Sequence, residues 1–511
     1  MFFRVHTGTL FGLEAIPVEA EVDISNGMPL IDIVGYLGSE VREAKERVRT
    51  AMRNSGYCLP PSRITINLAP ANVRKQGTAF DLPIALALLV CLGIIDGSRL
   101  EQYMALGELG LDGKIKGVTG VLPRVILARE QGMSKCILPS ENAGEGAAVN
   151  NMSIYGMNHL SEVVAFLNGD IEKEPWKKSK KNEKVQNAEK LDADFSELNG
   201  QLVLRRGLEI AAAGFHHALM IGPPGAGKTM AARRLPTILP DLLESEALEV
   251  SKIYSIAGLL GDEGIKTDRP FISPHHTSTP QALSGGGYIP KPGAVSLAHH
   301  GVLFLDELPE FRKETLEILR QPMEERVVHI TRVNATYTYP AHFLLLGAMN
   351  PCKCGYYPDR TRCHCKETEI DHYLGKISGP ILDRMDLSME ASEMKLEDLV
   401  VGGVNESSAT IKNRVMEARE RQKRRFINNS IHNNSNMGER EIHSYCQISE
   451  GGKKLLKDAF LKMRLSARAY YKILRVARTI ADLDRCDEIK EIHLYESIAY
   501  RNIDKRYWNH D

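Results

Sequence analysis

The sequence Gly-Pro-Pro-Gly-Ala-Gly-Lys-Thr at residues 222–229 constrains this chain more than any other feature. It matches the P-loop pattern G-x-x-x-x-G-K-[ST], in which backbone N–H groups surround phosphate oxygens. An apolar run at 217–221 precedes it, and a run at 230–235 that is compatible with a helix follows it. That strand–loop–helix context is what the pattern requires. We therefore predict an α/β core with a parallel sheet that binds a nucleotide.

The residue types in this loop predict how ATP is held. Lys228 supplies a positive charge for the β- and γ-phosphates, and the hydroxyl of Thr229 is a ligand for Mg²⁺. The start of the following helix adds its positive dipole end. The residues expected to contact the nucleotide are Gly222, Pro223, Pro224, Gly225, Ala226, Gly227, Lys228, Thr229 and Met230.

Two further apolar runs each end in polar side chains. Residues 301–307 indicate a buried strand that delivers Asp306 and Glu307 to the P-loop edge of the sheet. We predict that Asp306 holds Mg²⁺, directly or through water, and that Glu307 polarises the attacking water. The run at 342–349 ends in Asn350, which fits a residue that orients this water. Asn-Pro is also a good turn starter.

Four cysteines lie within fourteen residues as two Cys-x-Cys pairs: Cys352, Cys354, Cys363 and Cys365. In a reducing compartment such thiolates favour tetrahedral Zn²⁺, so we predict a structural zinc site in the loop 350–366. Free thiols or a redox pair are the alternatives, and His364 is an alternative to one sulfur ligand. The five remaining cysteines are scattered, and we expect structural thiols at Cys58, Cys91, Cys136, Cys446 and Cys486.

Length and composition indicate a soluble chain of about three domains. Acidic and basic residues balance at 65 each, so a nucleic-acid partner would require a local basic patch. The N-terminus lacks a long apolar segment, and the longest apolar stretch, 82–95, is too short for a bilayer. We expect a cytoplasmic protein without a membrane partner. The expected parts are an α+β domain at 1–168, a charged linker at 169–194, the ATPase core at 195–390 and a helical lid at 391–511.

Periodicity and capping residues predict the elements outside the core. In the first part we expect strands at 12–24, 63–68 and 135–139, a hairpin within 103–116, and helices at 39–54, 81–91, 121–131 and 159–168. In the last part we expect helices at 411–425, 450–464, 467–484 and 490–500. The run 411–425 is strongly basic.

Two arginines are candidates for contact with the nucleotide. Arg384 is expected at the far edge of the core, which fits an arginine finger that reaches the γ-phosphate of a neighbouring copy. The alternative is a surface pair with Asp383 or Asp386. Arg475 is our choice for sensor 2, a lid cation on the nucleotide, and the alternative is an exposed helical arginine. A finger of this kind would require a ring or at least a dimer.

The first part of the chain resembles the Lon protease domain, which has a ribosomal-protein-S5-like fold. The matching segments are 75–81 and 120–139. In Lon these segments carry a nucleophilic serine and a lysine base. In this chain the serine position falls on Ala79, and the lysine position falls near Arg124. Alanine has no nucleophile, and arginine is not a neutral base near pH 7. We expect the fold without the peptidase chemistry.

The whole chain resembles the ComM/YifB family of Mg-chelatase-like AAA+ ATPases. The most specific segments are 269–276, 284–293, 296–311, 349–355 and 376–384. The resemblance implies an AAA+ fold, ATP hydrolysis with Mg²⁺ and a hexameric ring. For ComM it implies branch migration of DNA during recombination of incoming strands. It also places Gln201 beside the adenine. The chain departs from the family at Lys353, where a proline is typical.

In this family's clade, an insert in helix 2 and a hairpin before sensor 1 line the central pore. The corresponding segments here are about 279–293 and 328–339. Cations and aromatic rings at their tips suit backbone contact and base stacking. The residues are Tyr288, Lys291, His329, Arg332 and Tyr337. The alternative is that they are ordinary loop and hairpin residues.

Three functions follow from these patterns. The first is an ATP-driven motor on single-stranded or branched DNA, a branch-migration helicase in recombination or natural transformation. The second is a subunit of a metal chelatase, and the third is an ATPase that remodels a protein partner without DNA, or an ATP-dependent protease. The cysteine cluster and the Lon-like part resemble the ComM type and argue against a chelatase subunit. The missing serine argues against proteolysis.

Overall fold

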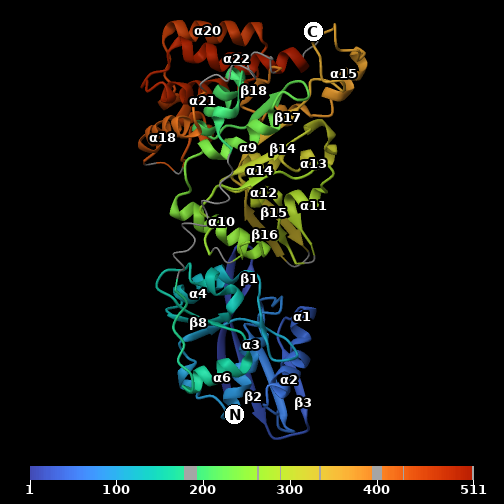
Figure 1. The fold of residues 1–511 in the computed structure, drawn as a ribbon, viewed down its shortest axis with the longest axis vertical. Coiled ribbons are helices and arrows are strands. Elements are labelled where there is room, and N and C mark those ends of the chain that lie inside the picture. Colours follow the sequence, from blue (N-terminus) through green and yellow to red (C-terminus); the bar gives the residue numbers. More distant parts are fainter. Residues whose placement is uncertain are drawn as a thin grey trace.

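The structure is a computed structural model, and it describes residues 1–177, 193–261, 264–287, 289–332, 335–393, 405–427, 429 and 431–508. Residues 178–192 of the expected linker and Tyr288 of the expected pore loop lie outside this description. Figure 1 shows an elongated molecule. A β-rich N-terminal part, a central sheet and a group of C-terminal helices follow one another along its long axis.

The N-terminal part contains a seven-stranded mixed sheet. Its order is β3 (Leu30–Val34), β4 (Arg63–Ala69), β2 (Glu14–Ser25), β1 (Phe2–Phe11), β5 (Tyr103–Ala105), β8 (Lys135–Pro139) and β9 (Ser153–Met157). β1, β2 and β4 pair antiparallel, whereas β3 runs parallel to β4. β5, β8 and β9 extend the sheet from β1 in parallel. The short strands β6 (Glu108–Leu109) and β7 (Ile115–Lys116) form the predicted hairpin.

The helices of this part are α1 (Ser39–Arg42), α2 (Ala44–Asn54), α3 (Asp81–Cys91), α4 (Val121–Glu130), α5 (Ala143–Gly146) and α6 (Leu160–Asn168). α3 is apolar on every side, and all of its residues are buried beneath β1 and β2. The helix predicted at 39–54 is two helices instead. They separate at Glu43, whose ψ of −16° tightens the backbone away from α-helical geometry.

The central sheet is parallel throughout. Its order is β11 (Phe271–Ile272), β14 (Val302–Leu305), β17 (Leu344–Met349), β10 (Ala218–Ile221) and β18 (Leu387–Glu390). β10 precedes the P-loop, lies between β17 and β18, and is completely buried. Because the strands are parallel, the segments after β10, β14 and β17 meet at one edge. The predicted α/β core with a parallel sheet is confirmed.

Helices and insertions surround this sheet. α8 (Leu202–Gly214) precedes β10, α9 (Lys228–Ile238) follows the P-loop, and α10 (Glu244–Ala257) comes next. The segment between β11 and β14 holds α11 (Pro280–Ser284), β12 (Gly285–Gly286), β13 (Lys291–Pro292) and α12 (Ala294–Leu297). The segment between β14 and β17 holds α13 (Lys313–Glu317), α14 (Arg320–Glu325) and the antiparallel hairpin of β15 (Val327–Arg332) and β16 (Ala335–Pro340). α15 (Glu367–Leu374) and α16 (Gly379–Leu382) precede β18.

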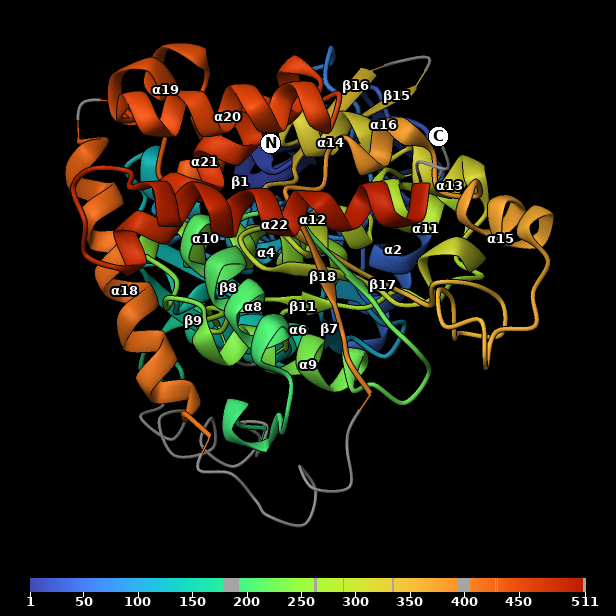
Figure 2. The same cartoon turned by 90° about the horizontal axis from the view of Figure 1, so that it is seen from above.

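The C-terminal part is helical, as predicted. It contains α18 (Ser408–Arg425), α19 (Glu439–Tyr445), α20 (Glu450–Lys462), α21 (Ala467–Leu483) and α22 (Glu491–Trp508). Figure 2 looks onto these helices and shows α22 across the middle of the molecule, where it contacts β18 and α21. In the part of the chain that the structure describes, no helix combines the length and the apolar character that crossing a membrane requires.

The N-terminal part is attached to the central sheet through α10. The Ser255 hydroxyl donates to the carboxylate of Glu145, which also accepts from the Leu122 backbone N–H at 2.8 Å. Apolar side chains of α4 and α10 share one core, which includes Val250 and Tyr254. A second contact joins the end of β1 to the β15–β16 hairpin, where the rings of Phe11 and Tyr337 lie 5.2 Å apart.

Ala79 and Arg124, the two positions at which the chain departs from Lon, are both part of the folded interior. Ala79 is buried in the core. Arg124 is also buried, and its guanidinium donates to three carbonyl oxygens: Gly8 at 2.9 Å, Thr119 at 2.6 Å and Gly120 at 3.0 Å. Burial lowers the pKa of Arg124 to about 10, which leaves it protonated at neutral pH. Arg124 therefore ties β1 to the start of α4.

Replacing Arg124 tests this role. Arg124→Met would leave three carbonyl groups without this donor, two of them in buried hydrogen bonds, and cost about 3 kcal/mol of local stability. Amide hydrogen exchange in β1 should then accelerate roughly hundredfold. The matched control is Arg129→Met, because Arg129 is exposed on the same helix. Equal exchange rates in the two variants would contradict the structural role of Arg124.

Candidate functional site

The P-loop connects β10 to α9 at the edge where the parallel strands end. Gly225 and Gly227 have φ values of +78° and +81°, which side chains with a Cβ rarely adopt. Gly222 approaches the backbone after β18 so closely that a Cβ there would lie 2.4 Å from the carbonyl oxygen of Ala391. Ala226 is buried, whereas Pro224, Thr229 and Met230 are exposed. The glycines therefore shape a loop whose outer side faces solvent.

The ammonium group of Lys228 is the centre of this loop. It donates to the carbonyl oxygens of Gly222 at 2.7 Å and Pro223 at 2.8 Å, and to Asn350 Oδ1 at 3.0 Å. Among the described residues no carboxylate forms an ion pair with it. Burial lowers the pKa of Lys228 to about 8, although the charge of Asp306 opposes this shift. Three neutral oxygens thus surround a partly dehydrated cation.

The predicted carboxylates lie beside this lysine. The Thr229 hydroxyl donates to Asp306 Oδ2 at 2.7 Å, and Asp306 Oδ1 accepts from the Glu307 backbone N–H at 2.9 Å. Glu307 has a φ of +51°, and its Oε2 lies 3.3 Å from Nδ1 of His276. Sequence reasoning gave His276 no role, because the pairing joins the segments that follow two different strands, β11 and β14.

Gln201 lies against the P-loop, but its amide is occupied. Its Nε2 donates to the carbonyl oxygens of Ala226 at 3.2 Å and Ser392 at 2.5 Å, and its Oε1 accepts from the Ser392 N–H at 3.2 Å. The side chain joins α8, the P-loop and the segment after β18. A pocket of about 600 Å³ begins here and includes Gly222 and Pro223 among its lining residues.

The four clustered cysteines converge in space. The Sγ atom of Cys352 lies 3.3 Å from that of Cys354 and 3.7 Å from that of Cys363, and Cys354 and Cys363 are 3.5 Å apart. Cys365 completes a group whose sulfurs all lie within 4.8 Å of one another. Tetrahedral Zn²⁺ with bonds of about 2.3 Å separates its sulfurs by about 3.8 Å. All nine cysteines are free thiols, and His364 is not part of this group.

A second group of candidate metal ligands consists of Glu249, His299 and His300. Its hydrogen bonds are already satisfied: both Nε2 atoms lie within 3.2 Å of Glu249 Oε2. Nδ1 of His299 accepts from the His342 N–H at 3.0 Å, so the proton of the neutral ring is on Nε2. Burial lowers the pKa of His299 to about 4, which keeps that ring neutral. We assign no metal to this group.

The two predicted arginines share a different pocket. Arg384 and Arg475 line a cavity of about 440 Å³ together with Arg326, Arg468 and Lys472. None of residues 222–230 lines this cavity. Arg384 pairs with Glu324 at 2.5 Å and not with Asp383 or Asp386, the alternative to a finger, and Arg468 lies 4.0 Å from the same carboxylate. The structure therefore groups Arg475 with Arg384 and not with the P-loop of its own chain.

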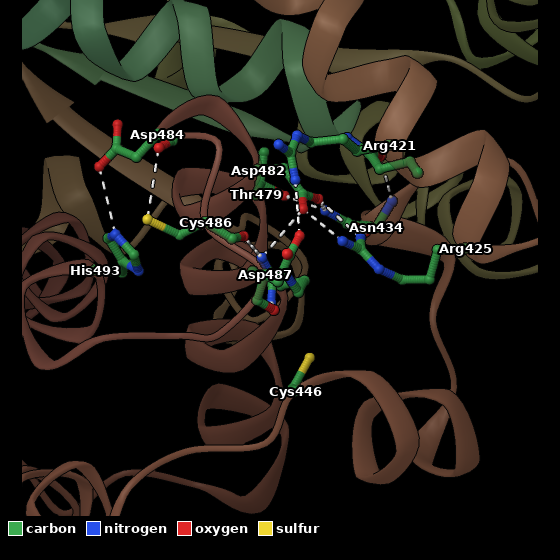
Figure 3. A network of polar contacts seen from close by, with 12 residues as sticks. Arg421, Arg425, Asn434, Cys446, Thr479, Asp482, Asp484, Cys486, Asp487 and His493 are labelled. Atoms are coloured by element: carbon green, nitrogen blue, oxygen red, sulfur yellow. Dashed lines mark hydrogen bonds and ion pairs between the residues drawn. The ribbon is translucent and has the colours of Figure 1, made fainter.

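The basic run of α18 is not an open cationic surface. Figure 3 shows Arg421 paired with Asp487, and Arg425 paired with Asp482 beside Asn434. Other members of the run are also engaged: Lys412 with Asp241, Arg414 with Glu209 and Glu406, and Arg424 with Glu420. The sequence indicated a local basic patch here, but acidic side chains from other segments balance most of it.

The predicted pore residues lie in two neighbouring hairpins. Arg332, exposed at the end of β15, donates to the Gly287 carbonyl oxygen at 3.2 Å, which joins the β15–β16 hairpin to the insertion. Lys291 and His329 are exposed. Tyr337 is not at the tip, because it pairs with Ile330 within the hairpin and packs on Phe11.

Family models and curated relatives match nearly the whole chain. The models described as magnesium chelatase subunit ChlI, subunit ChlI of Mg-chelatase and the C-terminal part of subunit ChlI match residues 194–399, 20–142 and 405–501. Lon protease 1 of Thermus thermophilus is 26% identical over 173 residues, which cover 31% of this chain and 20% of that protein.

Two relatives align from end to end. The protein YifB of Escherichia coli K12 is 44% identical over 505 residues, covering 98% of this chain and 97% of that protein. Competence protein ComM of Haemophilus influenzae is 41% identical over 498 residues, covering 97% of both chains. With this identity over almost its full length, the chain belongs to the ComM/YifB family of Mg-chelatase-like AAA+ ATPases.

Proposed function

We propose that this chain is an ATP-hydrolysing motor that acts on DNA as a ring. The observation that best supports a nucleotide site is the buried ammonium group of Lys228. Three neutral oxygens accept its hydrogen bonds, and no described carboxylate neutralises its charge. A triphosphate supplies the negative charge that such a site lacks. Gly222–Thr229 would surround the phosphates, with Met230 at the start of α9 beside them.

The residues next to Lys228 fit a Mg²⁺ ion and a hydrolytic water. Thr229 Oγ1 and Asp306 Oδ2 are oxygen ligands of the kind Mg²⁺ prefers, and they already lie 2.7 Å apart. When bound, Mg²⁺ would neutralise phosphate charge during transfer. Asn350 would orient the γ-phosphate and the water, and Glu307 would polarise that water after leaving His276. These roles rest on position and chemistry.

We propose that hydrolysis requires a neighbouring copy of the chain. Arg384 and Arg475 share one pocket, and no P-loop residue lines it. Both have a buried Nε atom without a hydrogen-bond partner in the described structure. A γ-phosphate of the adjacent subunit would exchange for Glu324 as the partner of Arg384. Repetition of such a heterologous contact closes a ring, which we propose to be a hexamer.

DNA is the client that we favour. The relative ComM is named a competence protein, and Lys291 and Arg332 present exposed cations on two hairpins that touch each other. The second candidate is an ATPase that remodels a protein. It is favoured by two observations that leave fewer side chains to contact DNA: the α18 arginines are paired with acids, and Tyr337 packs on Phe11. We also propose that the cysteine cluster binds Zn²⁺, and that the protein acts in the cytoplasm.

Steady-state ATPase rates distinguish these candidates. The rate is measured without nucleic acid and with single-stranded DNA, duplex DNA and a four-way junction, at about 50 and about 200 mM salt. We expect stimulation that is strongest with the junction and falls at the higher salt. Lys291→Ala combined with Arg332→Ala should reduce the stimulation and leave the basal rate, whereas Lys457→Ala on the exposed face of α20 should change neither.

Two results would contradict this proposal in different ways. A rate that Lys228→Ala abolishes, but that no DNA changes, would retain the ATPase and favour a protein client. A rate that survives Lys228→Ala would place hydrolysis outside the P-loop.

Mixing two inactive variants tests the shared site. Arg384→Ala should reduce the rate about a thousandfold, because the transition-state charge loses its guanidinium. Lys228→Ala should abolish hydrolysis at its own P-loop. In a mixed ring about a quarter of the interfaces would combine an intact P-loop with an intact Arg384, so activity should return on mixing. Parents and mixture that are equally inactive, although they assemble, would contradict a finger in trans.

A further inference from the structure

The loop that carries the four cysteines lies directly against the P-loop. Gly355 follows Cys354 and has a φ of +89°, and a Cβ there would lie 2.4 Å from Cδ of Pro224. The same residue donates its backbone N–H to the carbonyl oxygen of Cys352 at 3.0 Å and to its Sγ at 3.3 Å. One glycine therefore contacts both a thiol of the cluster and the phosphate-binding loop.

Beyond Gly355, the cysteine loop forms one side of the pocket of about 600 Å³ beside the P-loop. Residues from this loop that line the pocket include Tyr356, Tyr357, Asp359 and Arg362. The facing side comes from Gly200 and Gln201 before α8, from 221–223 and from 390–393. This pocket is continuous with the P-loop site, because Ile221, Gly222 and Pro223 line it.

Both arginines that line this pocket are paired with carboxylates. Arg362 covers the Tyr356 ring at 4.0 Å and forms an ion pair with Glu393 at 2.6 Å. Across the pocket, Glu390 pairs with Arg506 at 2.9 Å and accepts from the Tyr507 hydroxyl at 2.9 Å. Among the described residues that line the pocket, triphosphate meets no unpaired cation, whereas a base meets aromatic rings and hydrogen-bonding groups. The electrostatics therefore direct the phosphates to Lys228 and the nucleoside to this pocket.

Regular secondary structure contributes little support to the cysteine loop. Residues 350–366 contain no helix or strand, so few backbone hydrogen bonds fix their course. Sγ of Cys352 accepts from the backbone N–H groups of Gly355 and Tyr357, at 3.3 and 3.4 Å. A metal bound by four thiolates provides folding free energy to a loop of this kind. Loss of the metal would release Tyr356 and Gly355 together.

We propose that the four-cysteine loop forms one wall of a nucleoside subsite, and that its bound metal fixes the position of this wall relative to the P-loop. Nucleotide affinity then depends on metal occupancy. The inference rests on the proposed ATP site and names the segment that completes it. Its ligand is the base and ribose of the nucleotide.

Equilibrium binding on the full-length chain tests this inference. The probes are fluorescent ATP with Mg²⁺ and inorganic triphosphate, and zinc content is measured in parallel. Cys363→Ser should lose zinc and weaken ATP binding at least tenfold. Tyr356→Ala should keep zinc and weaken ATP roughly tenfold, while triphosphate binding stays unchanged. Gly355→Ala should keep zinc and weaken both ligands, because its Cβ displaces Pro224. Cys486→Ser, outside the cluster, should match the native chain in zinc content, ATP affinity and triphosphate affinity.

The outcomes separate this inference from the proposed function. Native chain that contains zinc and binds ATP, together with a Cys363→Ser chain that lacks zinc and binds ATP equally well, would overturn the inference and leave the ATP site intact. ATP affinity unchanged in Tyr356→Ala would also overturn it. Native chain that binds neither ATP nor triphosphate would overturn the proposed function, and this inference with it.

Discussion

A buried ammonium group surrounded by neutral oxygens is the constraint on which the rest of the site depends. Burying the charged ammonium group of Lys228 costs free energy unless an anion binds beside it. The same burial lowers its pKa to about 8. The left-handed glycines, the hydrogen bond from Thr229 to Asp306 and the contact with Asn350 all keep this ammonium at the edge of the parallel sheet. Phosphate binding follows from that position more directly than from any single contact.

The structure separates the phosphate site from the arginines that would complete it. Lys228 belongs to one edge of the sheet, and Arg384 and Arg475 belong to a cavity that no P-loop residue lines. Glu324 holds Arg384 within the subunit, so an incoming phosphate has to compete with this carboxylate. We propose that a chain built in this way gains full activity only where two copies meet. The proposed role of the cysteine loop adds a second dependence, because it would join metal binding to the nucleoside side of the same site.

The sequence predicted the parts of the site in which a short pattern determines the chemistry. The P-loop, Asp306 and Asn350 meet as expected, because each follows a buried parallel strand and such strands end at one edge. Contacts between segments distant in the sequence were not predictable. Arg421 in the basic run of α18 forms an ion pair with Asp487, and Tyr337 packs on Phe11. For the same reason the sequence missed the contact between Gly355 and Pro224. The division of the chain into four parts stays a prediction.

Calorimetric titration of the full-length chain with MgATP, in buffers of different ionisation enthalpy, tests the central claim most directly. With a Lys228 pKa of about 8 before binding, roughly half of the ammonium groups have lost their proton at pH 8. Phosphate charge raises that pKa, so binding should take up about half a proton per ATP at pH 8 and almost none at pH 6. Lys228→Met should show no such uptake. Tight binding by the native chain without proton uptake at pH 8 would contradict a dehydrated lysine as the phosphate partner.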